Sequence, residues 1–259
     1  MEISLREINS GYEEIVLKNI NLDIKSGSYN FIIGETGSGK STLLQTIGFL
    51  LKNKTGDIFW KNKNLSLKEH LKDYRENYGY MFQYTEKQFF NSTIKEEIIY
   101  SLVKRKISPE EIEKKLDEIL ELLKLSKDIL TRSPYEVSGG QKRFIALASI
   151  LITSPKILLL DEPTAGLDIE NKKLFFTILD KLKKSGITII QISHLLEDVL
   201  EYGDNVVALE KGKIIAQGKP FEVLKNSDLD FIKFCEIMNN FGVSTENIRN
   251  IDELLERIR

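Results

Sequence analysis

Residues 34–42 (GETGSGKST) have the composition and spacing of a loop that holds phosphate groups. They match the pattern G-x-x-x-x-G-K-[ST] through Gly34, Gly39, Lys40 and Ser41. In such a loop, successive backbone N–H groups point inward at phosphate oxygens, and the following helix adds its positive N-terminal end. We therefore expect Lys40 to reach the outer phosphates of a nucleoside triphosphate and Ser41 to ligate Mg²⁺. The other loop residues of the predicted site are Thr36, Gly37, Ser38 and Thr42.

The segments on either side of this loop decide between a phosphate site and a chance match in a Gly/Ser turn. A short, largely apolar run from Tyr29 to Ile33 precedes the loop, and residues 41–51 suit a helix. Strand, glycine loop and helix in this order form the context that the phosphate site requires. The loop therefore indicates a nucleoside-triphosphate-binding protein of the P-loop class.

Two adjacent carboxylates end a second apolar run, residues 157–162 (ILLLDE). Asp161 is placed to hold Mg²⁺, either directly or through water. Glu162 is the better candidate for polarising the attacking water, because it lies one residue further toward the open end of the strand. Two acids could also end a strand in a polar loop without a function. Together with the phosphate loop, they predict hydrolysis of the bound triphosphate.

A third motif, residues 137–141 (VSGGQ), resembles the signature of the ATP-binding cassette (ABC) family. The family signature usually begins with Leu, and Val137 keeps that position apolar. Ser138, Gly139 and Gly140, followed by Gln141, would open a helix whose N–H groups face an anion. The resemblance implies that this anion is the γ-phosphate of ATP bound by a partner subunit. An isolated SGGQ could be an ordinary helix cap, but here it stands in the family's order.

Four further residues match positions of the same family. By resemblance, Gln83 would sense Mg²⁺ and the attacking water, Asp168 would communicate across a dimer, and His194 would contact the γ-phosphate. Tyr12 is the aromatic residue best placed to stack on adenine. Taken alone, each residue could have a purely structural role. Gln83 could be a surface polar residue, Asp168 a helix cap and His194 a histidine at a strand end. Tyr12 could be a ring in the core.

Two segments resemble the ATPase subunits of energy-coupling-factor (ECF) importers of vitamins or metal ions. Residues 80–98 are similar to that family's F-Q-x-P-E-x-Q-x-F pattern, with Thr85 where Pro is usual. Residues 132–148 are similar to S-P-x-E-L-S-G-G-Q, and Phe144 replaces a usual second Arg after Arg143. The resemblance implies an ATP hydrolase that uses Mg²⁺ and drives transmembrane transport.

The same resemblance implies several partners. They are a second cassette ATPase (an identical chain or a paralogue), an integral membrane coupling subunit, and a membrane subunit that binds the solute. The chain would then lie peripherally on the cytoplasmic face of the membrane. The region 84–98 would grip a coupling helix that presents Arg. Glu86, Glu96 and Glu97 are all candidates for its acidic partner, and each could equally be a solvated surface charge.

Composition supports a globular protein without a nucleic-acid partner. Among 259 residues, 41% are hydrophobic, and 37 Lys and Arg oppose 39 Asp and Glu for a net charge of −2. This balance gives no argument for binding nucleic acid. The single cysteine, Cys235, excludes an internal disulfide. No stretch approaches the roughly 20 apolar residues that cross a bilayer, so a membrane function requires docking on another subunit.

Short apolar runs alternate with helical patterns along most of the chain, which predicts an α/β fold. We expect a P-loop NTPase with a RecA-like parallel sheet and an antiparallel β part. The cassette domain would span residues 1–220, with a helical subdomain at about 84–150. Residues 221–259 would form a small C-terminal helical extension, with helices at 229–241 and 250–259 and Cys235 on an apolar face.

Two other classes share the nucleotide motifs. A DNA-repair ATPase would carry a long coiled coil between phosphate loop and signature, and no sustained heptads separate Ser41 from Ser138. The closer rival is the ATPase of a conventional binding-protein-dependent importer. The similarity of residues 80–98 to the ECF pattern argues against this alternative. Thr85, which departs from that pattern, leaves the alternative open.

Overall fold

The computed structural model of the chain describes residues 2–51, 53–225, 238, 239, 245, 248–250, 253 and 256. Its N-terminal part is a four-stranded antiparallel sheet in the order β2-β1-β4-β5. The strands are β1 (Ile3–Ser10), β2 (Leu17–Ile24), β4 (Asn53–Trp60) and β5 (Lys63–Asn64). Buried and exposed residues alternate along most of β2, as expected for a strand with one face on the core.

A six-stranded sheet forms the centre of the molecule, in the order β10-β9-β3-β8-β7-β6. Every neighbouring pair is parallel except β9 and β10. Its strands are β3 (Tyr29–Ile33), β6 (Tyr78–Met81), β7 (Ile157–Asp161), β8 (Thr188–Ile192), β9 (Asn205–Glu210) and β10 (Lys213–Gly218). All residues of β3, β7 and β8 are buried, which explains their continuous apolar runs. The predicted fold class is confirmed.

Helix α1 (Lys40–Ile47) contacts β1 of the antiparallel sheet and β7 and β8 of the parallel sheet. Its buried Leu43, Leu44 and Ile47 join residues of both sheets in one apolar core. The helix ends at Ile47, four residues before the end expected from the sequence, because Gly48 caps it and Phe49 turns into the left-handed region.

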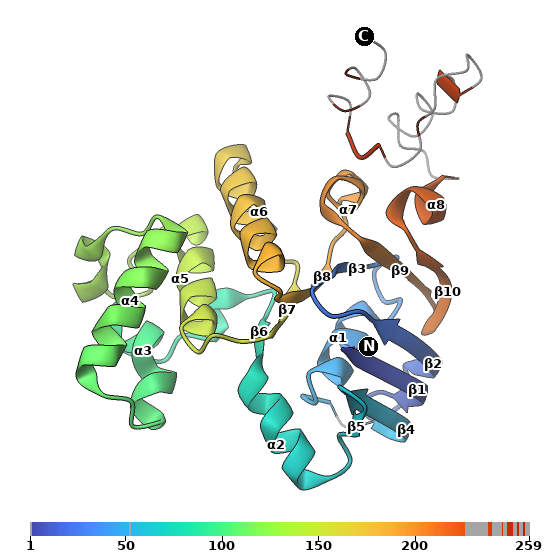
Figure 1. Cartoon of the computed structure of the whole chain (residues 1–259), viewed down its shortest axis with the longest axis horizontal. Coiled ribbons are helices and arrows are strands. Elements are labelled where there is room, and N and C mark those ends of the chain that lie inside the picture. The colour runs from blue at the N-terminus through green and yellow to red at the C-terminus, as the bar shows by residue number, and fades with distance from the viewer. Residues whose placement is uncertain are drawn as a thin grey trace.

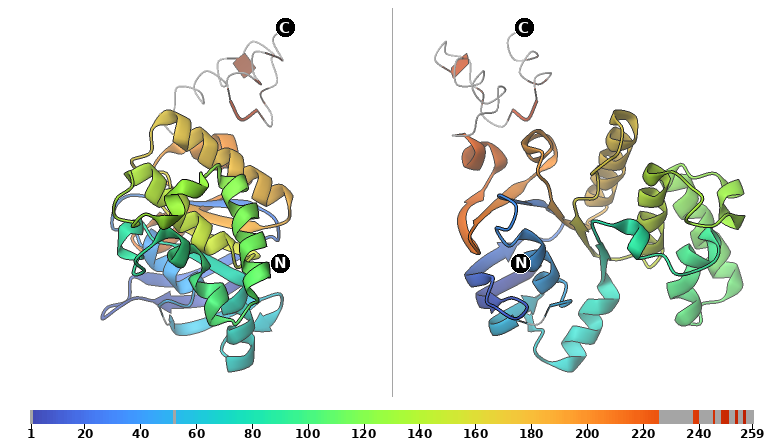
Figure 2. Two further views of the ribbon diagram at one scale, coloured as in Figure 1. Left: turned by 90° about the vertical axis from the view of Figure 1, so that its left-hand side faces the viewer. Right: turned by 180° about the vertical axis from the view of Figure 1, so that it is seen from behind.

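A group of helices follows β6 and lies apart from the antiparallel sheet, beyond β6 and β7 (Figures 1 and 2). Their bounds are η1 (Thr85–Lys87), α3 (Ile94–Lys104), α4 (Pro109–Leu123), η2 (Lys127–Thr131) and α5 (Gly139–Leu151). Between β6 and β7 the structure has no strand among these described residues, in line with the helix-rich stretch expected there. Helix α4 buries Ile112, Leu116, Leu120 and Leu123 on one face, with Ile119 partly buried beside them.

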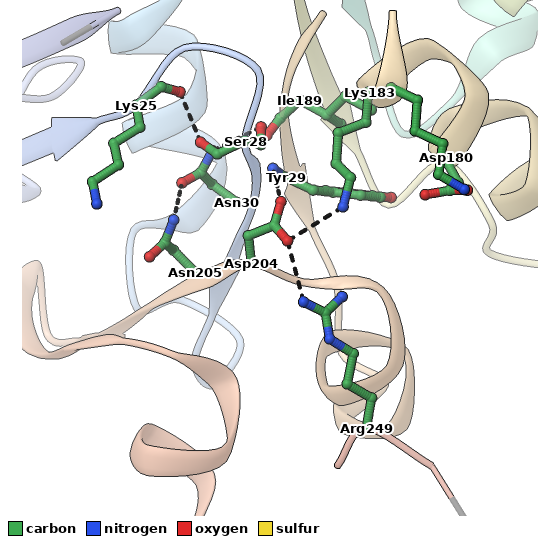
Figure 3. A network of polar contacts seen from close by, with 11 residues as sticks. Lys25, Ser28, Tyr29, Asn30, Asp180, Lys183, Ile189, Asp204, Asn205 and Arg249 are labelled. Carbon is green, nitrogen blue, oxygen red and sulfur yellow. Dashed lines mark hydrogen bonds and ion pairs between the residues drawn. The ribbon is translucent and has the colours of Figure 1, made fainter. Parts of the chain in front are cut away.

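The remaining helices are α2 (Lys68–Asn77), which precedes β6, and α6 (Ile169–Lys184), α7 (Leu196–Tyr202) and α8 (Pro220–Leu224). At the start of β9, the Asp204 carboxylate ties three segments together (Figure 3). It accepts a hydrogen bond from Tyr29 N at 3.0 Å and pairs with Lys183 Nζ at 3.2 Å and Arg249 at 3.4 Å. This network fixes the start of β3 and the far end of α6.

Most of the expected C-terminal extension lies outside the described residues. That holds for Cys235 and for the helix expected at 229–241, apart from residues 238 and 239, which are helical. Of the helix expected at 250–259, the structure describes residues 250, 253 and 256. Across the described part of the chain, no helix combines the length and apolar character needed to span a membrane.

Candidate functional site

Four loops meet at one edge of the central sheet, because each follows the carboxyl end of a parallel strand. The phosphate loop follows β3, Gln83 follows β6, Asp161 ends β7 with Glu162 directly after it, and His194 follows β8. These strands are neighbours in the order β3-β8-β7-β6. The carboxyl edge of an open parallel sheet is where such folds place their ligands. Candidates that are far apart in sequence are therefore brought to one place.

The phosphate loop passes so close to β9 that glycine is required at its start. A Cβ on Gly34 would lie 2.2 Å from the carbonyl oxygen of Leu209, and its φ of 144° is unfavourable for other residues. Gly39, with φ of 104°, turns the chain directly into α1. The helix thus begins without a capping side chain, and its first N–H groups remain available for an anion.

Lys40 lies at the first position of α1 and is buried. Its Nζ donates to the carbonyl oxygens of Gly34 and Glu35, both at 2.8 Å. Burial lowers the pKa of Lys40, while the charges of Glu162 and Asp161 act in the opposite direction. The buried hydroxyl of Ser38 has no hydrogen-bond partner among the described residues. A cation held by its own loop beside an unpaired hydroxyl fits a site for phosphate oxygens.

Asp161 faces the same loop from the end of β7. Its Oδ1 accepts a hydrogen bond from Ser41 Oγ at 3.4 Å, and the residue is 5% exposed. Burial raises the pKa of Asp161; the Ser41 bond lowers it and the nearby Glu162 charge raises it. A hydroxyl and a carboxylate converging in this way are the oxygen donors that Mg²⁺ prefers. Asp161 and Ser41 therefore fit a magnesium site.

Glu162 is the centre of the polar contacts at this edge. Its Oε2 accepts from Gln83 Nε2 at 3.1 Å, and its Oε1 lies 2.7 Å from His194 Nε2. Its backbone is left-handed, with φ of 48°, which is uncommon for a residue with a side chain and occurs often at functional sites. Gln83, Glu162 and His194, which the sequence assigns to Mg²⁺, the attacking water and the γ-phosphate, thus form one connected group.

Arg143 supports this group in a way that the sequence did not reveal. From α5, its guanidinium donates to the backbone oxygens of Gln83 at 3.1 Å and Glu162 at 3.4 Å. Burial lowers the pKa of Arg143, and the charges of Glu86 and Glu162 raise it. The next residue, Phe144, is buried and packs edge-on against Phe175 at 5.7 Å, so the unusual Phe contributes to the core.

Tyr12 lies on the surface, with 60% of the residue exposed. Its hydroxyl donates to Gln45 Oε1 on α1 at 2.6 Å. The ring is therefore held near the helix that begins at the phosphate loop and remains accessible to a flat ligand. The structure excludes the alternative that Tyr12 is a core ring.

The signature residues begin α5 on an exposed surface. Ser138 caps the helix by accepting from Gln141 N at 3.2 Å, and Gln141 Oε1 accepts from Ser138 N at 3.1 Å. This is a complete capping box. A Cβ added to Gly139 would meet nothing within 4 Å, so packing within the chain does not require glycine there. Val137, the departure from the family signature, is buried as expected.

Asp168 caps α6, accepting from the backbone N–H of Asn171 at 2.8 Å and from its Nδ2 at 2.7 Å. These hydrogen bonds, the backbone one first, hold the pKa of Asp168 below its usual value. The side chain is exposed and is not part of the group around Glu162. A cap and a contact with another subunit are compatible roles, because the carboxylate remains at the surface.

Of the three acidic candidates in the 84–98 region, two are engaged locally. Glu97 is buried, and its Oε2 accepts from Phe90 N at 3.1 Å and from Asn91 N and Nδ2 at 2.9 Å. Glu96 completes a capping box with Thr93. Glu86 is exposed. Glu97 is therefore a structural carboxylate and not the solvated surface charge considered from the sequence.

Comparison with known proteins agrees with this geometry. The sequence profile of the ABC transporter family matches residues 17–165. The energy-coupling factor transporter ATP-binding protein EcfA2 of Streptococcus pyogenes serotype M3 is 41% identical over 226 residues, covering 86% of this chain and 81% of the relative. The chain belongs to the energy-coupling factor transporter ATP-binding proteins, within the ABC transporter family. The resemblance drawn from the motifs is confirmed.

Solved structures of ABC ATPases have the same fold. The cbiO1 protein from Clostridium perfringens, described as part of the ABC transporter complex cbiONQ, superposes with a TM-score of 0.79 at 32% identity. The match covers 92% of this chain and 98% of cbiO1. The cassette MJ0796, solved as a dimer in a post-hydrolysis state with ADP and phosphate, gives 0.76 at 30% identity, covering 84% and 98% of the two chains. Both matches place this ECF ATP-binding protein among nucleotide-binding cassettes.

Proposed function

We propose that this chain hydrolyses ATP to drive a membrane importer of a vitamin or metal ion. The observation that carries the proposal is the group formed by Gln83, Glu162 and His194 beside the phosphate loop. Each carboxylate oxygen of Glu162 contacts one of the other two side chains. Such a connected acid, next to a lysine that can bind phosphate and an acid that can bind Mg²⁺, has the parts needed for phosphoryl transfer to water.

The roles of the residues follow from their positions. Backbone N–H groups of the loop, with Lys40, Ser38 and Thr42, would bind the phosphates, and Tyr12 would stack on adenine. Ser41, Asp161 and Gln83 would hold Mg²⁺, which neutralises charge on the phosphate oxygens when bound.

Glu162 would orient the attacking water and accept its hydrogen bond. In the structure each of its oxygens accepts one hydrogen bond, so each keeps a lone pair that could accept a hydrogen bond from the water. Because Gln83 donates to Glu162 through Nε2, its Oε1 would be left to hold the metal, and His194 would contact the γ-phosphate.

A second cassette subunit would complete the site. The exposed helix start at Ser138, Gly139 and Gly140 has N–H groups suited to an anion, but it lies on the surface of this chain. The relative MJ0796 was solved as a dimer, which supports a pair of cassettes. The second subunit would be an identical chain or a paralogue. Asp168 would lie at the contact between the two subunits and communicate across it.

The membrane partners would bind near residues 82–90. Phe82, Tyr84 and Phe90 expose large apolar side chains there. Among the three acids of this region, Glu86 is the one not engaged in a described local hydrogen bond, so we propose it as the partner of an arginine on a coupling helix. With such partners, the chain would lie peripherally on the cytoplasmic face of the membrane, beside a coupling subunit and a solute-binding subunit.

We retain residues 1–220 as the cassette domain, with its helical subdomain at about 84–150, and residues 221–259 as an appended segment. The strand-free stretch between β6 and β7 supports the helical subdomain. The boundary at 220 falls at the first residue of α8, which packs on β9 and β10 and places Leu224 in the cassette core.

Co-purification from membranes would test the proposal. A tagged chain should bring down a membrane coupling subunit and a small solute-binding membrane protein, and the complex should hydrolyse MgATP. Recovery of the membrane subunits of a binding-protein-dependent importer would instead favour the conventional importer. A well-folded complex that binds ATP but never hydrolyses it would refute the proposed activity.

A further inference from the structure

Helices α6 and α7 are joined by two contacts, one turn apart. Lys172 Nζ lies 2.7 Å from Asp198 Oδ1, and the rings of Phe176 and Tyr202 stack with centroids 4.1 Å apart and an interplanar angle of 2°. The second contact is four residues after the first in both helices, which is about one helical turn. These two contacts place the helices side by side and running in the same direction.

Each helix begins just after a loop that carries a candidate functional residue. Asp168 caps α6 and lies four residues before Lys172. His194 precedes α7 and lies four residues before Asp198. The ion pair is thus the contact between the helices that is nearest to both loops among those of the described residues. Movement of one helix relative to the other would change the spacing of the two loops.

The environment of Asp198 makes this contact specific. The residue is 5% exposed, and its second oxygen, Oδ2, is buried without a hydrogen-bond partner among the described residues. Burial raises the pKa of Asp198, while the hydrogen bond and charge of Lys172 lower it. A buried carboxylate that depends on one cation fixes that cation's position strongly, because separating them leaves an uncompensated charge.

We propose that Lys172 and Asp198 are positioning residues that set the placement of His194 relative to the Asp168 loop. They touch neither phosphate loop nor Glu162 and act through the helices that follow each loop. The ion pair would couple the loop that carries Asp168 to His194, which contacts Glu162. Contact with a second cassette at the Asp168 loop would then help to place the catalytic group. This inference rests on the proposed ATP hydrolysis.

The test compares three single variants in steady-state ATP hydrolysis, nucleotide titration and thermal unfolding. Lys172→Met should lower kcat about tenfold while the affinity for ATP stays within about twofold, a coupling effect of ordinary size. Lys172→Arg keeps the charge and should recover most of the rate.

Lys183→Met is the matched control, because Lys183 pairs with Asp204 at the opposite end of α6. It should lower the unfolding temperature by less than Lys172→Met does, because Asp204 keeps Arg249 and Tyr29 N as partners, and it should leave kcat within about twofold of the wild type.

A double variant, Lys172→Met with Asp198→Asn, removes both charges and avoids the cost of a lone buried carboxylate. It should unfold near the wild-type temperature and still show the reduced kcat. A wild-type kcat in the double variant, or an equal loss of kcat in Lys183→Met, would overturn the inference. Both results presuppose an active wild-type chain; a wild type that binds MgATP without hydrolysing it would instead refute the proposed function.

Discussion

Two helices of this chain begin with glycine and serine at a place suited to an anion, and their surroundings are opposite. At the start of α1, Gly39 provides no capping side chain, and Ser38 and Lys40 are buried. At the start of α5, Ser138 and Gln141 form a closed capping box on an exposed surface. The first start is incomplete without a ligand, whereas the second is satisfied in the isolated chain.

The difference shows how one chain can contribute two unlike halves of a site. The α1 start faces Asp161 and, beyond it, Glu162, so its chemistry is assembled within the chain. At the α5 start, the described hydrogen bonds of Ser138 and Gln141 join these two residues to each other and not to Asp161 or Glu162. The glycines of this start, unopposed by neighbouring atoms at Gly139, suit the close approach of another molecule. Substitutions at the two starts should therefore separate ATP binding from turnover.

The largest effect on turnover is expected for a substitution of Glu162, in the part of the site that one chain assembles by itself. Glu162→Gln keeps the size of the side chain and removes its basicity, so kcat should fall about 10²- to 10³-fold, as for loss of a general base. ATP affinity, measured by titration, should change little because the phosphate loop is intact. Hydrolysis at the wild-type rate would remove Glu162 from its role.

The next effect is a loss of ATP affinity at the α1 start. Lys40→Ala removes a charged donor to the phosphates, which should weaken ATP binding roughly 10- to 100-fold, the size of a hydrogen bond to a charged group. Calorimetric titration of the purified chain measures this directly. Unchanged affinity would mean that the nucleotide binds elsewhere.

The α5 start should respond in the opposite way. Ser138→Arg places a long side chain on the surface that would receive the partner's nucleotide, so it should reduce turnover roughly 10- to 100-fold by obstructing that contact. The affinity of the single chain for ATP should remain within about twofold, since Ser138 is not part of its own phosphate loop. An equal loss of ATP affinity in Ser138→Arg and Lys40→Ala would contradict the claim that only the α1 start binds the chain's own ATP.

The smallest effect concerns the stability of the helical part that carries the α5 start. Glu97→Gln weakens three hydrogen bonds to residues 90 and 91 and should lower the free energy of unfolding by about 1–2 kcal/mol. Thermal unfolding measures it, with an expected shift of about 2–6 °C. Glu96→Gln is the control: Gln also completes a capping box, so the change should be a few tenths of a kcal/mol. Identical shifts would refute the structural role of Glu97.

Much of this arrangement was predictable because its determinants are local. The apolar runs of β3, β7 and β8 and the glycine pattern of residues 34–42 each specify their own conformation. Parallel strands then bring Gln83, Glu162 and His194 to one edge. The capping box at Ser138 is likewise encoded within four residues.

Other features depend on contacts between distant segments, which spacing does not encode. Arg143 reaches the backbone oxygens of Gln83 and Glu162 only because α5 packs beside the ends of β6 and β7. Glu97 resembled a surface charge in sequence because nothing nearby signals that its chain folds back on Phe90. The ion pair between Lys172 and Asp198 similarly requires α6 and α7 to be neighbours.

Mixing two impaired variants tests most directly whether the site is divided between chains. A pair of Lys40→Ala and Ser138→Arg chains contains one undamaged combination, the phosphate loop of the Ser138→Arg chain with the signature of the Lys40→Ala chain. The account predicts that the mixture hydrolyses ATP well above the sum of the separate variants. Activity no greater than that sum, with wild-type chains active under the same conditions, would contradict it.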